Sequence, residues 1–335
     1  MSHPTISAGR MRKSAALFAT AALAALALTA CGTSDSSSSS DADSVTVLRS
    51  TGSTFEPLFI AQEQGFFADE GLDVTIKEGA QDTSQNAPSV VNGEAQFAMT
   101  DSSGFIKGAA SGLPIQIVSG LQASTTTVPA SDGLVVPADS DITSFADVGG
   151  KTIALPALGG TLEFICDYSA EQAGVDPSTI DYVSLPLTSI VDAVAKGQVD
   201  GAYVFATFLD AAESQGMNVI GEGTSALPGL PQALLFGDST WLADNGDSAT
   251  KFVNAIEKAV DYANENPEAV RAVDTEYTEL PAEYIKNRQI QPFYSDIDTD
   301  SFSTIVSGMK SYGLIDSEPD AGTLLWSGAP TGTIE

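Results

Sequence analysis

Hydroxyl, glycine and aromatic side chains gather at the points where predicted strands end and the next helices begin. In parallel α/β sheets, ligands bind beyond the carboxyl ends of the strands, where helix N-termini present free N–H groups. Side chains of these types suit a small polar or anionic group held by neutral donors. Because Ser, Thr and Asp are also preferred N-caps, ordinary helix capping is the alternative. The expected ligand-binding residues are Ser53, Thr54, Phe55, Asp101, Ser102, Ser103, Gly160, Thr161, Thr188, Tyr203 and Phe205.

Three carboxylates lie close to these loops, whereas basic groups are scarce there. Glu56, Asp101 and Glu163 can pair with an amine or a ring nitrogen. No Lys or Arg falls within the loops, and Arg49 is the nearest. These charges argue against a strongly anionic ligand. A pair such as Asp101 and Glu163 can also act as general acid and base, so an exported enzyme is a minor alternative.

Most catalytic and metal-binding side chains are missing. The only histidine is His3, which is lost if the N-terminus is cleaved, and Cys166 is the only cysteine besides Cys31. Ser-His-Asp triads, Cys-His pairs and histidine-ligated metals are therefore excluded from the mature chain. No cofactor, metal or intramolecular disulfide is expected.

The N-terminus has the pattern of a secretion signal. Basic residues at positions 10–13 precede the apolar run 14–27, which is shorter than the ~20 residues of a membrane span. The run 28–31, Leu-Thr-Ala-Cys, resembles a bacterial lipobox, whose cysteine is acylated and becomes the mature N-terminus. We therefore expect a lipoprotein signal peptide at 1–30, a lipid anchor on Cys31 and an extracytoplasmic location at the cell membrane.

The sequence after the predicted signal peptide begins with a polar segment and is strongly acidic. Residues 31–44 are rich in Ser and Asp and are expected to form a flexible tether. Three of the 14 basic residues lie in the signal, which leaves 11 basic against 44 acidic residues and a formal charge of −33. This charge disfavours nucleic acid and anionic lipid head groups as partners. A monomer is expected.

Short β-rich runs alternate with helical patterns in two series. The first has strands at 45–48, 72–76, 96–99 and 115–118, and the second at 151–155, 182–185, 201–204 and 218–220. A helical region follows, with one apolar stripe along 251–264. Such alternation is typical of mostly parallel sheets with helices on both faces, so two lobes with a cleft between them are predicted.

Four motifs resemble one family of transport receptors. They are PLFIA with GFFADEGLDV at 57–74, VNGEAQFA at 91–98, GKTIA at 150–154 and AKGQVDGA at 195–202. In order and spacing they are similar to solute-binding proteins of ATP-binding-cassette (ABC) importers, in the group that takes nitrate, sulfonates, taurine and thiamine-pyrimidine precursors. The cysteine-rich motif of the branch that makes the pyrimidine enzymatically is absent, and the resemblance is weak from Lys251 onward.

The resemblance implies an α/β fold of the type II periplasmic-binding-protein class, with two Rossmann-like lobes joined by two crossing segments near 131–136 and 232–237. The first lobe would comprise 45–132 and 237–335, and the second 133–236. It also implies that a small sulfonate-, nitrate- or taurine-like nutrient is trapped between the lobes and delivered to the permease subunits. A pyrimidine or another heterocycle is the alternative nutrient.

Overall fold

The computed structural model describes residues 43–50, 54–80 and 82–335. The predicted signal peptide, the lipidation site Cys31 and the candidate Ser53 lie outside these residues. The strands are β1 (Asp43–Arg49), β2 (Leu72–Glu78), β3 (Phe97–Thr100), β4 (Ile115–Ala123), β5 (Asp132–Val136), β6 (Thr152–Leu155), β7 (Asp181–Ser184), β8 (Gly201–Phe205), β9 (Asn218–Ile220) and β10 (Pro231–Asp238). The helices are α1 (Glu56–Glu63), α2 (Phe66–Asp69), α3 (Asn86–Val91), α4 (Ser102–Ala110), α5 (Thr161–Gln172), α6 (Leu187–Ala195), α7 (Thr207–Ser214), α8 (Ser239–Asp244), α9 (Gly246–Glu265), α10 (Pro267–Tyr277), α11 (Ala282–Asn287) and α12 (Thr299–Ser311).

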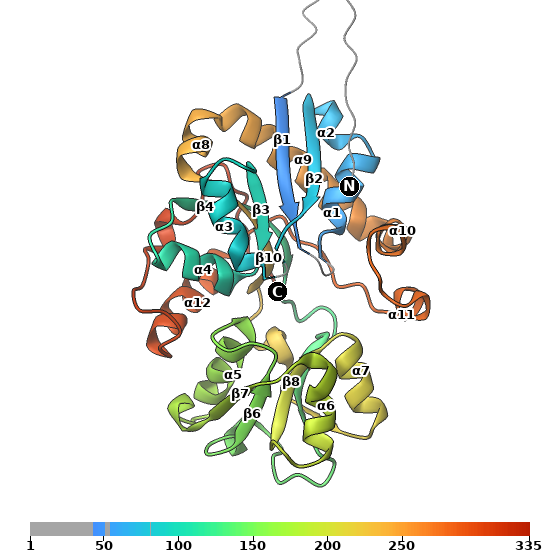
Figure 1. The fold of residues 1–335 in the computed structure, drawn as a ribbon, viewed down its shortest axis with the longest axis vertical. Helices are drawn as coiled ribbons and strands as arrows, with labels where there is room; N and C mark the ends of the chain where they lie inside the picture. The colour runs from blue at the N-terminus through green and yellow to red at the C-terminus, as the bar shows by residue number, and fades with distance from the viewer. Residues whose placement is uncertain (1–42, 51–53, 81) are drawn as a thin grey trace, which may run out of the picture. The chain divides into compact units, whose positions relative to one another are not determined.

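The described strands form two five-stranded sheets with matching topology (Figure 1). Their orders are β2-β1-β3-β10-β4 and β7-β6-β8-β5-β9. Each sheet holds one strand that is antiparallel to both of its neighbours, β10 in the first and β5 in the second. β5 follows β4 of the first sheet and β10 follows β9 of the second, so the chain crosses between the sheets twice. The predicted α/β fold with two lobes is confirmed.

Both crossings lie earlier in the chain than expected. Residues 132–136, which the sequence placed at the first crossing, form β5 of the second sheet. β10 pairs with β3 and β4, so residues 231–236, which the sequence placed in the second lobe, lie in the first sheet. The crossing segments are 124–131 and 221–230, and Ser124 ties them together. Its N–H donates to the carbonyl oxygen of Leu230 at 2.9 Å, and its Oγ accepts from the Leu230 N–H at 3.0 Å. The buried apolar run 233–236 marks a central strand without indicating to which sheet it belongs.

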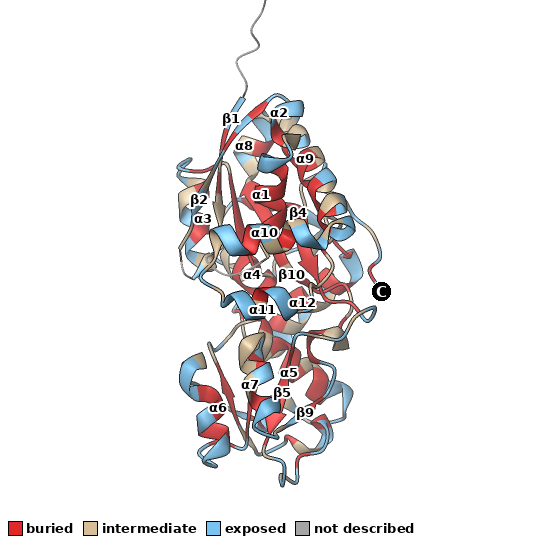
Figure 2. Cartoon of the chain, turned by 90° about the vertical axis from the view of Figure 1, so that its right-hand side faces the viewer, coloured by how far each residue is buried: buried red, intermediate tan, exposed pale blue. Residues whose placement is uncertain are grey.

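Buried residues lie along the strands and on the inner faces of the helices (Figure 2). Most of their side chains are apolar. One group lies between the first sheet and α1, α9 and α10, and another between the second sheet and α6 and α7. A third group joins both lobes, because α5 packs against α12. A Cβ on Gly308 would lie 2.5 Å from the ring of Phe164, so only glycine permits this close approach. No helix of the described region is long and apolar enough to cross a bilayer.

Candidate ligand-binding site

A cavity of about 460 Å³ lies between residues of the two lobes, and we call it the interlobe cavity. Its volume is in the range that holds small-molecule ligands. The first lobe contributes Thr54, Glu56, Asp101, Gln122, Gln232 and Arg288. The second lobe and the crossing segments contribute Asp132, Gly160, Thr161, Phe205, Ala206 and Thr224. The ends of β3 and β8 and the beginnings of α4 and α5 therefore meet here, as the strand-end argument predicts.

Asp101 connects the first turns of two helices that belong to different lobes. Its Oδ1 accepts a hydrogen bond from the Gly104 N–H at 2.9 Å and thereby caps α4. Its Oδ2 accepts from the hydroxyls of Ser103 and Thr161, both at 2.8 Å. Because Thr161 begins α5, this last bond links the lobes at the cavity wall. A negative charge is favourable at helix N-termini, so the carboxylate occupies a position suited to an anion.

Asp132, at the start of β5, has most of its hydrogen-bonding capacity filled. Its Oδ2 accepts from the Tyr203 hydroxyl and from the Thr224 N–H at 2.9 Å, and its Oδ1 accepts from the Thr224 hydroxyl at 2.8 Å. Burial raises the pKa of Asp132, although these donors act in the opposite direction. The side chain holds the crossing region together and faces the cavity at the same time.

The charged wall of the interlobe cavity is a buried group of one guanidinium and two carboxylates. Arg288 Nη2 lies 2.9 Å from Glu56 Oε1 and 2.6 Å from Asp274 Oδ2, and Nε also donates to Asp274 Oδ2 at 2.9 Å. Glu56 Oε2 and Asp274 Oδ1 are buried without a hydrogen-bond partner among the described residues. Burial raises the pKa of Glu56 to about 7, although Arg288 lowers it. Both carboxylates therefore retain bonding capacity, and Glu56 is the one of the two that lines the cavity.

Backbone strain is concentrated at the same cavity. Among the described residues, Thr54 and Ala206 are the non-glycine residues with positive φ, at 81° and 49°. Both line the interlobe cavity. Such conformations cost about 1–3 kcal/mol each and persist where the surroundings impose them, commonly at ligand sites. This observation supports the cavity as the functional site.

The structure sorts the predicted site residues into three groups. Five line the interlobe cavity directly: Thr54, Asp101, Gly160, Thr161 and Phe205. Two donate hydrogen bonds to lining carboxylates: Ser103 to Asp101 and Tyr203 to Asp132. Three others do not line the cavity: Phe55, Ser102 and Thr188.

The three residues that miss the cavity do so for local reasons. Phe55 is fully buried because the start of α1 faces the core, where its ring contacts Phe59 at 5.5 Å between centroids. Ser102 is also buried, and its hydroxyl donates to the carbonyl oxygen of Pro231. Thr188 is exposed at the start of α6. The position of a residue directly after a predicted strand therefore does not determine whether its side chain points into the cavity.

Arg288 is the residue that sequence reasoning missed. It follows α11 in the C-terminal region, where only a helical pattern was visible, and no strand-end loop marked it. The strand-end loops contain no Lys or Arg, but Arg288 lines the cavity from a distant part of the chain. No local sequence signal identifies it, since its partners Glu56 and Asp274 are 232 and 14 positions away.

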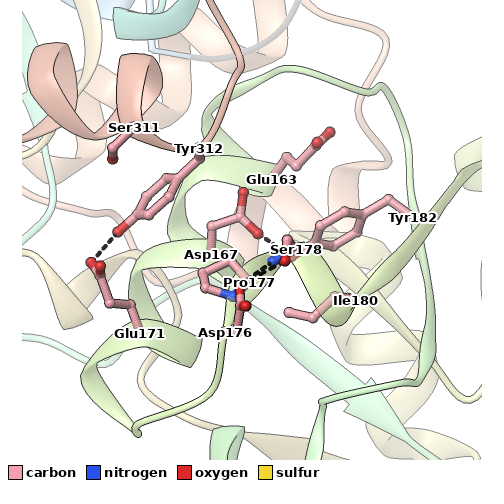
Figure 3. Close-up of a pocket in the computed structure, with 10 residues that line it drawn as sticks. All are labelled: Glu163, Asp167, Glu171, Asp176, Pro177, Ser178, Ile180, Tyr182, Ser311 and Tyr312. Atoms are coloured by element: carbon pink, nitrogen blue, oxygen red, sulfur yellow. Dashed lines mark hydrogen bonds between the residues drawn. The ribbon is translucent and has the colours of Figure 1, made fainter.

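A second pocket, of about 400 Å³, lies beside α5 and we call it the acidic hollow (Figure 3). Its carboxylates are Glu163, Asp167, Glu171 and Asp176, and each has a donor. Those donors are the Gly159 N–H at 2.6 Å, the Tyr182 hydroxyl at 2.8 Å, the Tyr312 hydroxyl at 2.6 Å and the Ser178 hydroxyl at 2.7 Å, respectively. Burial raises the pKa of Asp167 to about 7, against the effect of the Tyr182 hydrogen bond.

The two carboxylates considered as an acid–base pair for an exported enzyme, Asp101 and Glu163, do not share a pocket. Glu163 lines the hollow and Asp101 lines the interlobe cavity, so the two line different pockets. Within the described residues, no cluster of three or more His, Cys, Asp and Glu side chains has an arrangement that holds a metal ion.

Comparison with known proteins supports the resemblance noted from the motifs. The profile described as NMT1/THI5 like matches residues 53–270, more than half of the chain. The taurine-binding periplasmic protein of Escherichia coli (strain K12) is 27% identical over 249 residues, which cover 74% of this chain and 69% of that protein. A 4-amino-5-hydroxymethyl-2-methylpyrimidine phosphate synthase of Legionella pneumophila is 28% identical over 152 residues, 45% of each chain.

Solved structures support the fold. The periplasmic aliphatic sulphonate-binding protein SsuA of Escherichia coli superimposes with a TM-score of 0.71 at 16% identity, covering 86% of this chain and 98% of that one. At this identity the likeness concerns the fold alone. The predicted periplasmic-binding-protein fold is confirmed.

Proposed function

This chain belongs to the NMT1/THI5-like family, and we propose that it is the lipid-anchored receptor of an ABC importer. In this role it captures one small nutrient between its lobes outside the cell membrane and presents the closed form to the permease. Cys31 carries the lipid, and the folded part acts as a monomer without a cofactor. The tether runs from Cys31 to the start of β1 at Asp43, so the expected tether end at residue 44 is corrected by two residues. The taurine-binding relative and the fold support the receptor role.

One observation carries the proposal: the interlobe cavity is built from strand and helix ends of both lobes, and a hydrogen bond closes it. The Thr161 hydroxyl reaches Asp101 across the lobes, beside the lining of that cavity. A ligand that contacts both lobes stabilises the form in which they are together, because its contacts exist only there. The two crossing segments at Ser124 and Leu230 are the natural hinge.

Among the expected nutrients, the lining favours one that carries an amine. Glu56, Asp101 and Asp132 face the cavity against one guanidinium, which disfavours nitrate and simple alkanesulfonates. Taurine carries an ammonium beside its sulfonate, so it fits better. An aminopyrimidine is the second candidate, supported by the amides of Gln122 and Gln232, which offer both donors and acceptors.

The receptor is proposed to be non-catalytic. The acid–base pair considered from the sequence, Asp101 and Glu163, is divided between two pockets. The Legionella relative named as a synthase matches less than half of this chain. To test this point, the bound small molecule is identified by mass spectrometry before and after prolonged incubation with the protein. Accumulation of a product would contradict it.

Membrane attachment has its own test. Cys31→Ser is expected to move the protein from the membrane fraction to the soluble fraction, because the acyl chains need the thiol. Cys166→Ser is the matched control, since Cys166 is buried in α5 and is expected to leave the distribution unchanged. Continued membrane association of the Cys31→Ser protein would contradict lipid anchoring.

A test of the receptor role needs no knowledge of the ligand. Protein purified from its host is analysed by native mass spectrometry for a co-purified small molecule, and then by small-angle scattering before and after that molecule is removed by partial unfolding and refolding. We expect a single bound species and a larger radius of gyration once it is gone. A protein that binds no small molecule in its host would contradict the receptor role.

A further inference from the structure

Glu56 has an unusual environment for a buried carboxylate. Only 1% of its surface is exposed, yet Oε2 has no donor among the described residues. Leaving a buried acceptor without a partner costs about 1–3 kcal/mol, and more in its charged form. Since Glu56 lines the interlobe cavity, the missing donor has a place from which to come.

Arg288 does not neutralise Glu56 completely, because it serves two carboxylates. Two of its nitrogens, Nε and Nη2, donate to Asp274 Oδ2, whereas only Nη2 also reaches Glu56. Asp274 is fully buried and offsets the charge of the guanidinium. The pair formed by Arg288 and Asp274 is therefore formally neutral, so the Glu56 carboxylate is compensated only through the Nη2 that it shares with Asp274, and Asp274 helps to raise the pKa of Glu56.

The position in the cavity that would best hold an anion is already occupied. Asp101 accepts hydrogen bonds at the first turn of α4 and from Thr161 at the first turn of α5. Helix N-termini attract negative charge, and here the protein supplies that charge itself. Lys107 lies against Gly159, and Arg49 stacks on Phe55. Neither of these two cations is part of the lining.

We propose that the ligand is a small organic cation, such as an amidine, a guanidine or an aminated heterocycle, and that Glu56 Oε2 accepts a hydrogen bond from its positively charged nitrogen. Asp101 and Asp132 strengthen the negative potential, and Phe205, 37% exposed, offers an aromatic face for the body of the ligand. This inference rests on the proposed receptor function and narrows its substrate class from an amine-carrying nutrient, taurine included, to a cation without an anionic group.

The ionisation of Glu56 agrees with this assignment. Burial raises its pKa to about 7, and the charged groups that face it are Arg288 and Asp274, with Asp101 and Asp132 on the same cavity. A cation bound at Oε2 favours the carboxylate, so it lowers this pKa and releases a proton. Proton release on binding is therefore a property of the wild-type protein that needs no substitution to measure.

The experiment is calorimetric titration of the full mature chain with two series of probes. Benzamidine and agmatine represent organic cations, and ethanesulfonate and nitrate represent anions. At least one cation is expected to bind, to release a proton when buffers of different ionisation enthalpy are compared at pH 7, and to bind about tenfold more weakly to Glu56→Gln. Glu257→Gln, a half-buried carboxylate of α9 outside the cavity, is the matched control and should bind as the wild type does.

Three results would overturn the inference. They are failure of both cations to bind, binding of a cation that Glu56→Gln leaves unchanged, and binding of an anion with no cation bound. In the last case the receptor function stands and only the substrate class is wrong. The receptor function itself fails only if no small molecule accompanies the protein from its host. If Glu56→Gln does not fold, proton release by the wild type decides the question.

Discussion

The interlobe cavity and the acidic hollow border the same helix, α5, and both are rich in carboxylates, yet their hydrogen bonds are completed differently. In the acidic hollow, Glu163, Asp167, Glu171 and Asp176 each accept a hydrogen bond from the protein itself. In the interlobe cavity, Glu56 keeps an oxygen without a donor. The number of acidic groups therefore does not identify a ligand site. Unfilled bonding capacity on a buried group that lines a cavity does so, because a ligand in that cavity can supply the missing donor.

The largest effect is expected from removing the cation of the interlobe cavity. Arg288→Met leaves Glu56 and Asp274 buried without a counter-charge, and such losses cost about 3–5 kcal/mol. Denaturant unfolding measures it. The matched control is Arg271→Met, whose partner Glu268 is 92% exposed at the side chain, so less than about 1 kcal/mol is expected. Equal losses of unfolding free energy in the two variants would contradict the conclusion that Arg288 compensates buried carboxylates.

The next comparison separates the lining of the cavity from the core behind it. Phe55→Ala removes a fully buried ring and is expected to destabilise the protein by about 3–5 kcal/mol. Phe205→Ala removes a partly exposed ring and should change the unfolding free energy by less than about 1 kcal/mol while it weakens ligand binding. Thermal unfolding and titration on the same samples check both. If Phe55→Ala is as stable as the wild type but binds ligand more weakly, Phe55 is a ligand-binding residue and not only part of the core.

Two hydrogen bonds across the lobes allow a direct test of the two regions. Thr161→Val removes the bond to Asp101 at the interlobe cavity, and Tyr312→Phe removes the bond to Glu171 at the acidic hollow. We expect a loss of about 1.5–3 kcal/mol in Thr161→Val, because a charged acceptor loses a donor in a partly buried place. Tyr312→Phe should cost less than about 1 kcal/mol, since that bond is exposed.

Ligand affinity gives the sharper readout for the same pair. Thr161→Val should weaken binding of whichever ligand the receptor takes, because the bond between Thr161 and Asp101 belongs to the closed form. Tyr312→Phe should leave affinity within about twofold. The reverse order of affinities would make the acidic hollow the ligand site.

Stability is also expected to depend on pH, through one carboxylate in each region. The pKa values of Glu56 and Asp167 are raised to about 7, so the folded state binds protons more strongly than the unfolded chain does. Stability from these groups is complete below their unfolded pKa values, near 4, and is lost as pH rises to about 7 and above. The melting temperature without ligand should therefore fall between pH 5 and pH 8, and less so in Glu56→Gln/Asp167→Asn.

Binding of a cation should distinguish the two groups. Affinity is expected to rise between pH 6 and pH 8 in the wild type and in Asp167→Asn, because only Glu56 faces the interlobe cavity. Calorimetry at several pH values measures this. An affinity that falls over the same interval would contradict the role of Glu56 as the acceptor.

The fold was largely predictable from the sequence because each strand is a short apolar run next to a helical pattern. β10 was assigned to the wrong lobe, since the apolar run 233–236 specifies burial on both faces and not the identity of its neighbours. The partners of a strand depend on the path of the whole chain. Local patterning carries no information on that path.

The site was predictable in its position and less so in its chemistry. Strand ends indicated Asp101, Thr161 and Phe205, and all three line the interlobe cavity because parallel strands bring their carboxyl ends together. Arg288 was not predictable, since it reaches the cavity from the end of α11 and pairs with residues far away in the sequence. The unpartnered oxygen of Glu56 is likewise a property of three-dimensional packing.

The most direct test of the account is a crystal structure of the protein with the small molecule that it carries from its host. We predict electron density in the interlobe cavity, with a nitrogen of the ligand within hydrogen-bond distance of Glu56 Oε2. Density in the acidic hollow, or an anion in the interlobe cavity that makes no contact with Glu56, would contradict the central claim.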